Sequence, residues 1–187
     1  MNGPLSYADI EQEFEESLGY IRNDIAELLR RNVGLNYTVA LLIGCACEAL
    51  AASDGRHHHD VFADLLDGEW RSLAKPLFNA LRNGLAHSFD TKHLHVEGEA
   101  IQIHISWTLT EMFVIEKCDG APRLVLGIQP LANRLCKKVN EFKAMLQNHA
   151  PARQRFRQAC QKERIAQFSL SEADVWKRLV ASSKHQC

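Results

Sequence analysis

The stretch WRSLAKPLFNALRNGLAH (residues 70–87) organises the rest of the chain. Its apolar residues recur every three or four positions, which predicts an amphipathic helix with one buried face. These residues are Trp70, Leu73, Ala74, Leu77, Phe78, Leu81 and Leu85. Pro76 has no amide donor, so we expect this helix to be kinked or to begin afresh near Lys75. Arg82 and Asn83 fall on the polar side, and His87 stands where the helical pattern ends.

Arg82 and His87 are five residues apart, so a regular helix separates them by about 140° around its axis. Asn83 and His87 are four apart and share a face. One helix therefore does not easily bring Arg82 and His87 onto one target. Either the last turn loosens near Gly84, or two copies of the helix meet and combine an arginine with a histidine.

The arrangement of Arg82, Asn83 and His87 resembles the HEPN superfamily (higher eukaryotes and prokaryotes nucleotide-binding domains). Its signature is an arginine, a polar residue, three further residues and a histidine near the end of a helix. Leu81 and the Leu-Ala-His-Ser run at residues 85–88 also look like that family. The resemblance covers about residues 35–90.

The resemblance implies an antiparallel helical bundle that cleaves RNA without a metal or cofactor. The 2′-hydroxyl attacks the adjacent phosphate, which leaves a 2′,3′-cyclic phosphate and a 5′-hydroxyl. His87 would exchange protons, Arg82 would bind the phosphate, and Asn83 would hydrogen-bond the phosphate or the His87 ring. Family members often are toxins or defence effectors and pair two motifs across a dimer. We therefore expect a homodimer that binds RNA or a nucleotide, and possible control by an antitoxin protein.

Other interpretations of the same residues stay open. Arg82 at a helix edge is also typical of an ion pair, and His87 at a helix C-terminus is favoured by the helix dipole alone. The alternative function is a non-catalytic nucleotide-binding, RNA-binding or protein-interaction module. A DNA-binding regulator is the third hypothesis, and the absence of a clear helix-turn-helix pattern disfavours it.

Two long helices are predicted before the motif, and a short helix through Leu66 follows the His57–His59 run. Residues 6–32 have the most regular apolar spacing in the chain. Residues 36–53 are apolar all round, as in the central helix of a bundle, and Glu48 is the one charge before Asp54. An isolated buried carboxylate is costly, so Glu48 either reaches the surface at the rim, or pairs with Arg82 or orients His87.

After the motif the apolar spacing changes from helical to alternating, which predicts strands. A hairpin is expected around Gly98, with two more strands around Asp119-Gly120. The predicted fold class is therefore mainly α, with a small antiparallel β-sheet at about 91–127 inserted before the C-terminal helices. His93, His95 and His104 could share its polar face, but no Cys or carboxylate completes a zinc site, so no metal is expected. The run His57–His59 predicts a polar loop or helix start.

The predicted organisation is a helical domain over 1–150, including the β region, and a basic helical appendage over 151–187. Helical spacing predicts helices over 129–149, from Pro151 to about Ile165, and after Ser171. Arg153, Arg155 and Arg157 make the segment after Pro151 a candidate RNA-binding surface, although a solvated helix face explains them equally.

Composition excludes little. The formal net charge of −1 demands no polyanionic partner. Six cysteines without regular spacing, and an N-terminus without a signal-peptide pattern, favour reduced thiols and a cytoplasmic location. Glu48 interrupts the most apolar segment, so no membrane association is expected.

Overall fold

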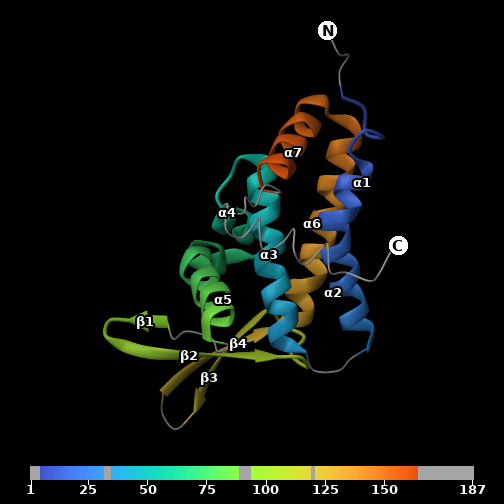
Figure 1. Ribbon diagram of the computed structural model, residues 1–187. Helices are drawn as coiled ribbons and strands as arrows, with labels where there is room; N and C mark the ends of the chain where they lie inside the picture. The colour runs from blue at the N-terminus through green and yellow to red at the C-terminus, as the bar shows by residue number, and fades with distance from the viewer. Residues whose placement is uncertain (1–4, 32–34, 89–93, 119–120, 164–187) are drawn as a thin grey trace, which may run out of the picture.

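The computed structural model describes residues 5–31, 35–88, 94–118 and 121–163, and only the backbone at 83, 85–88 and 162–163. The helical elements are α1 (Glu11–Phe14), η1 (Glu15–Gly19), α2 (Tyr20–Arg31), α3 (Asn36–Asp54), α4 (His58–Ala63), η2 (Gly68–Leu73), α5 (Ala74–Ser88), α6 (Ile128–Asn148) and α7 (Ala150–Glu163). The strands are β1 (Leu94–Val96), β2 (Glu99–Ser106), β3 (Phe113–Cys118) and β4 (Ala121–Gly127). A mainly helical fold with a small sheet is confirmed (Figure 1).

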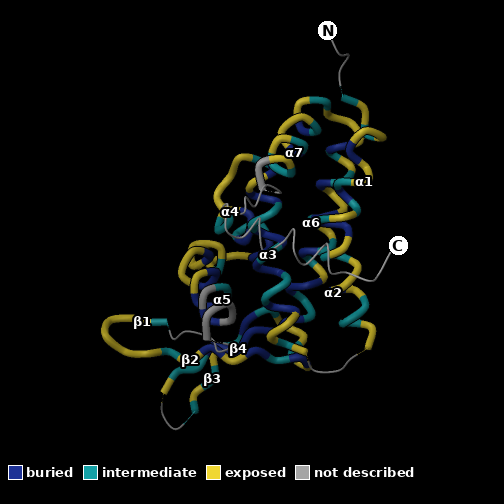
Figure 2. Tube along the Cα trace, viewed as in Figure 1, coloured by how far each residue is buried: buried dark blue, intermediate teal, exposed yellow. Residues whose placement is uncertain are grey.

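Helix α3 is the centre of the bundle, as its all-round apolar sequence predicts. It packs against α2, α4, α5, α6 and α7, and the buried residues concentrate along it and α6 (Figure 2). By length and mean hydropathy α3 could also cross a membrane, and half of that window is buried inside the fold. The five helices that pack around α3 account for its apolar composition.

The first predicted helix begins later than expected and is not uniform. Ser6 donates hydrogen bonds from its amide and hydroxyl to Asp9, at 2.8 and 2.7 Å, and this turn occupies the residues before α1. Helical residues then run from Glu11 to Arg31, but η1 is a π-helical turn. Apolar spacing alone does not distinguish a π turn from α-helix, so the irregularity could not be predicted.

The sheet is mixed, and the expectation of an antiparallel sheet was wrong. The strand order is β1-β2-β4-β3, and β2 and β4 run parallel while the other two pairs are antiparallel. The physical reason is β4, in which Leu124, Val125 and Leu126 are buried in succession. A strand buried on both faces belongs in the middle of a sheet. Residues 107–112 therefore connect β2 to β3 at the outer edge of the sheet, and β4 then returns between β3 and β2.

The remaining helices form where the sequence predicts them. Residues 68–73 make the 3-10 turn η2, and α5 begins afresh at Ala74, so Pro76 falls in the first turn, where its missing amide costs nothing. Helix α7 places Ala152 and Phe156 in the same hydrophobic core as α1 and α6. The helix expected after Ser171 lies outside the described residues.

Candidate functional site

Arg82 forms an ion pair with Glu48 across the α3–α5 packing interface. Its Nη2 donates a hydrogen bond to Oε2 of Glu48 at 3.2 Å. Its Nε lies 2.8 Å from Oε1 without hydrogen-bond alignment, so this second contact is electrostatic. The two side chains are 29% and 37% exposed, so both remain accessible from solvent. The pairing that the sequence suggested for Glu48 is present.

The electrostatics of this pair keep the arginine charged. The hydrogen bond to Glu48, followed by its negative charge, raises the pKa of Arg82 above its usual value. Cys45 lies one turn before Glu48, and burial raises the pKa of its thiol. The thiol is therefore protonated at neutral pH and a poor nucleophile. Among the described side chains where α5 packs on α3, the ionic group that a ligand can reach is the Arg82–Glu48 pair.

Gly44 lets the Arg82 side chain lie against α3. A Cβ at Gly44 would come within 3.1 Å of Cγ and 3.5 Å of Cβ of Arg82. Gly44 and Glu48 are four residues apart and share a face of α3. The arginine stem therefore crosses the helix at a glycine, and the guanidinium reaches the carboxylate one turn further on.

Helix α5 stays α-helical through Ser88, so the last turn does not loosen at Gly84. Position 87 is consequently about 140° around the axis from position 82. The side chains of Asn83 and His87 lie outside the described residues, so their proposed roles remain predictions. Of the two arrangements that the sequence left open, the one that needs a loosened last turn does not match the helical backbone of α5.

The basic residues of α7 make contacts within the chain. Arg153 donates to the carbonyls of Leu5 and Leu146, at 2.5 and 2.7 Å. Arg157 donates to the carbonyl of Asp9 and lies 3.4 Å from a carboxylate oxygen of Glu13.

Arg155 differs from these two because its side chain is half exposed and its Nη2 lies a distant 4.0 Å from a carboxylate oxygen of Asp54. Two of the three RNA-binding candidates therefore anchor the N-terminal segment, and Arg155 is the most available to a ligand.

The histidine run has structural contacts. His57 precedes α4 in extended conformation. The ring of His58 stacks on Phe78 of α5 at 4.6 Å between centroids, and His57 stacks on His59 at 5.2 Å. Within the described residues, no group of three or more His, Cys, Asp and Glu side chains could hold a metal ion. His93 of the zinc hypothesis lies outside those residues.

A second charged cluster, which sequence spacing did not predict, joins α4 to α6. Asp64 accepts from Arg56 at 2.8 Å and lies 2.9 Å from Nζ of Lys138. The hydrogen bond from Arg56 is the main cause that lowers the pKa of Asp64 to about 2.

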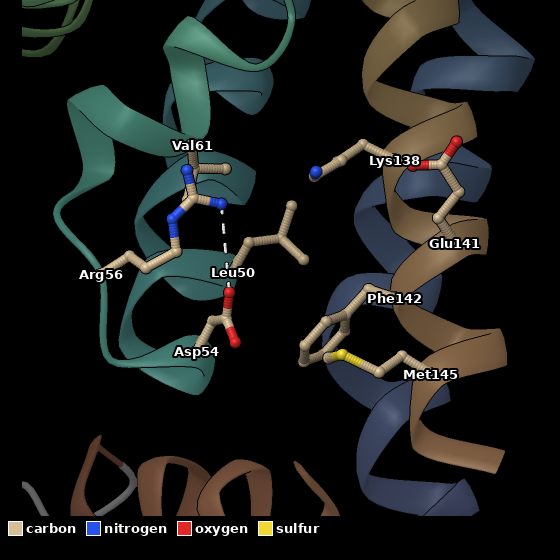
Figure 3. Close-up of a pocket in the computed structure, with 8 residues that line it drawn as sticks. All are labelled: Leu50, Asp54, Arg56, Val61, Lys138, Glu141, Phe142 and Met145. Carbon is tan, nitrogen blue, oxygen red and sulfur yellow. Dashed lines mark ion pairs between the residues drawn. The ribbon is translucent and has the colours of Figure 1, made fainter. Parts of the chain in front are cut away.

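Beside this cluster lies a cavity of about 110 Å³, with Leu50 and Phe142 among its apolar lining, Asp54 on one side and Glu141 on the opposite side (Figure 3). Its volume is below the range of about 300–1,000 Å³ typical of ligand pockets. The cluster therefore serves to join two helices.

No protein-family model matches this chain, and neither a curated protein nor a solved structure matches it. Function is therefore inferred from the residues themselves.

Proposed function

We propose that the protein is a metal-independent endoribonuclease whose active site forms between two copies of α5. In this proposal Arg82 of one protomer stabilises the charge on the phosphate, and His87 of the other moves the proton of the 2′-hydroxyl. Asn83 shares the face of His87 and hydrogen-bonds either the phosphate or the imidazole. No metal or cofactor takes part, because RNA carries its own nucleophile.

The observation that supports this proposal is a charged arginine held at the surface of a helix that stays regular to its end. Glu48 and Gly44 fix the direction of the Arg82 side chain, which reduces the entropy lost when it binds a phosphate. Because α5 is regular through Ser88, positions 82 and 87 serve one phosphate most readily when they come from different chains. Such pairing makes the dimer a requirement of catalysis.

The first experiment measures cleavage of mixed RNA in EDTA. Wild-type protein should yield products with 2′,3′-cyclic phosphate and 5′-hydroxyl ends, and Arg82→Ala and His87→Ala should each lose about 10²–10⁴-fold in rate. His104→Ala, which changes an exposed histidine on β2, is the matched control and should retain full activity. Cleavage that persists in both motif variants would show that another site or a contaminant is responsible.

The second experiment tests the shared site by complementation. Mixed Arg82→Ala and His87→Ala protomers form heterodimers with one intact site, made of the arginine of one chain and the histidine of the other. With random exchange about half of the dimers are mixed, so activity should return to about a quarter of the wild-type value. An inactive mixture that light scattering shows to be dimeric would overturn the shared site. Monomeric wild-type protein would do the same.

A non-catalytic nucleotide-binding or RNA-binding module is the second candidate. It is favoured by the same ion pair, since Glu48 offsets the charge of Arg82 and competes with a phosphate for its donors. Under this alternative, wild-type protein binds RNA or nucleotide in EDTA without cleavage, and Arg82→Ala weakens binding.

The nuclease proposal includes a toxin role restrained by an antitoxin protein in the cytoplasm. Expression of active protein should then arrest growth, and His87→Ala should not.

A further inference from the structure

One face of the sheet is apolar well beyond the part that the helices cover. The register places Ile105, Leu126 and Phe113 side by side in one row. These three are at most 8% exposed. In the next row Ile103 and Leu124 remain buried, but Ile115 of β3 is 65% exposed. The apolar face of the sheet therefore continues beyond the residues that the rest of the protein buries.

The β1–β2 hairpin extends this face further. Leu94 pairs with Ile101 in the antiparallel register, so both side chains lie on the same side of the sheet. Val96 shares that side and is 52% exposed. Exposed apolar side chains that lie side by side are typical of a binding site, because binding removes their surface from water.

The turn η2 and the start of α5 stand opposite the exposed part of this face and complete a cavity of about 380 Å³. Trp70, Leu73 and Leu77 form this second wall. Trp70 is fixed because its ring stacks on Phe113 at 4.5 Å between centroids, and Leu73 is 45% exposed at the rim. The volume falls within the range of about 300–1,000 Å³ found for small-molecule sites.

The chemistry of the lining selects the ligand. Among the residues that the structure describes, no Asp, Glu, Lys or Arg lines the cavity, and His95 is the one ionisable residue in its lining. A phosphate or carboxylate entering it would lose its hydration without gaining a counter-charge. An uncharged, flat apolar molecule would instead replace water against leucine, isoleucine, proline and tryptophan surfaces.

We propose that this cavity binds a small uncharged apolar molecule of about two to three rings. The site is separate from Arg82, which faces α3, and stands independently of the ribonuclease proposal. A concave hollow bounded by η2 and α5, the β1–β2 hairpin and the β3–β4 pair fits a compact ligand better than the flat surface of a protein partner.

The test uses two fluorescent probes that share one ring system and differ in charge. N-phenyl-1-naphthylamine is uncharged, and 1-anilinonaphthalene-8-sulfonate carries a sulfonate. The uncharged probe should bind one molecule per chain with a micromolar Kd, at least about tenfold more tightly than the sulfonate. Equal binding of both probes, or no saturable binding of the uncharged one, would refute the proposal.

Variants locate the site. Ile115→Glu on the sheet and Leu73→Glu on the helical wall should each weaken the uncharged probe at least about tenfold. Tyr20→Glu is the matched control, because Tyr20 is 62% exposed on α2, away from the cavity, and it should bind normally. Circular dichroism checks that all three variants fold.

Unchanged binding in the two cavity variants would place the probe elsewhere and overturn the assignment. If wild-type protein is dimeric and binds no probe, and Ile115→Glu makes it monomeric, the face is an interface between copies and the proposal fails.

Discussion

A methyl group at Gly44 would lie 3.1 Å from Cγ of Arg82, so the absence of a side chain on α3 determines where the arginine can lie. Side-chain position at the candidate site thus depends on a residue that has no functional group. The same contact leads to a prediction about stability, in which helix propensity and steric crowding act in opposite directions.

Gly44→Ala should have little effect on stability, or reduce it, in wild-type protein, and should stabilise the Arg82→Ala variant by about 1 kcal/mol. Alanine favours helix over glycine by that amount, but in wild-type protein the new methyl crowds the arginine stem. Removing the stem frees the space. Urea unfolding of the four proteins measures this as a double-mutant cycle. Equal effects of Gly44→Ala in both backgrounds would show that the contact carries no strain.

Glu48→Gln should remove a coupling of about 0.2–1 kcal/mol with Arg82, since both groups are partly solvent-exposed. The cycle Glu48→Gln, Arg82→Gln and the double variant isolates that term. The coupling should shrink between 50 mM and about 1 M salt, because ions screen exposed pairs. A coupling that does not respond to salt would mean that the pair acts through packing and not through charge.

Asp64→Asn should destabilise the protein by about 1–2 kcal/mol at pH 7, and the two proteins should converge in acid. The pKa of Asp64 is lowered from 3.8 to about 2, chiefly by the hydrogen bond from Arg56. A lowered pKa means that the contribution is complete above pH 4 and is lost as pH falls from about 4 through about 2.

Urea unfolding at several pH values measures this convergence. Asp24→Asn, which changes an exposed aspartate on α2, should show no such dependence. A constant difference between wild type and Asp64→Asn down to pH 2 would contradict the assignment.

Gly127→Ala should cost about 3 kcal/mol or more, because its Cβ would meet the carbonyl oxygen of Glu111 in the loop before β3. Backbone cannot move aside as a side chain can, and the amide of Gly127 is also tied to the carbonyl of Met112 at 2.9 Å.

Gly55→Ala is the informative comparison for this substitution. Gly55 ends α3 at φ +71° in open space, so alanine there costs only the left-handed conformation, about 1 kcal/mol. If thermal unfolding shows equal losses for the two variants, steric contact at Gly127 is not the cause.

The elements were predictable from sequence wherever one periodicity dominated. The helices over Asn36–Asp54 and Ile128–Asn148, the restart near Pro76 and the hairpin around Gly98 were all predicted. Strand direction was not, because a run such as Leu124–Leu126 shows burial but not which neighbour covers it. The parallel pairing of β2 with β4 is determined by tertiary packing and not by the local sequence.

The candidate site was predictable only in part. The pairing of Glu48 with Arg82 followed from the cost of a charge in an apolar helix. The close packing of the Arg82 side chain on Gly44 depends on how α3 and α5 cross, and the spacing of residues in the sequence does not reveal that crossing. The roles of Arg153 and Arg157 depended on carbonyls of Leu5 and Asp9, about 150 residues away in sequence.

The packing of α7 on α3, and the bonds from its arginines to the N-terminal segment, have a consequence for synthesis on the ribosome. Until residue 157 has emerged, α3 lacks one of its covering helices and the first turn lacks its anchor. In the nascent chain α3, the most apolar helix, is therefore partly exposed for most of translation. A chaperone that binds apolar helices could bind α3 during that interval.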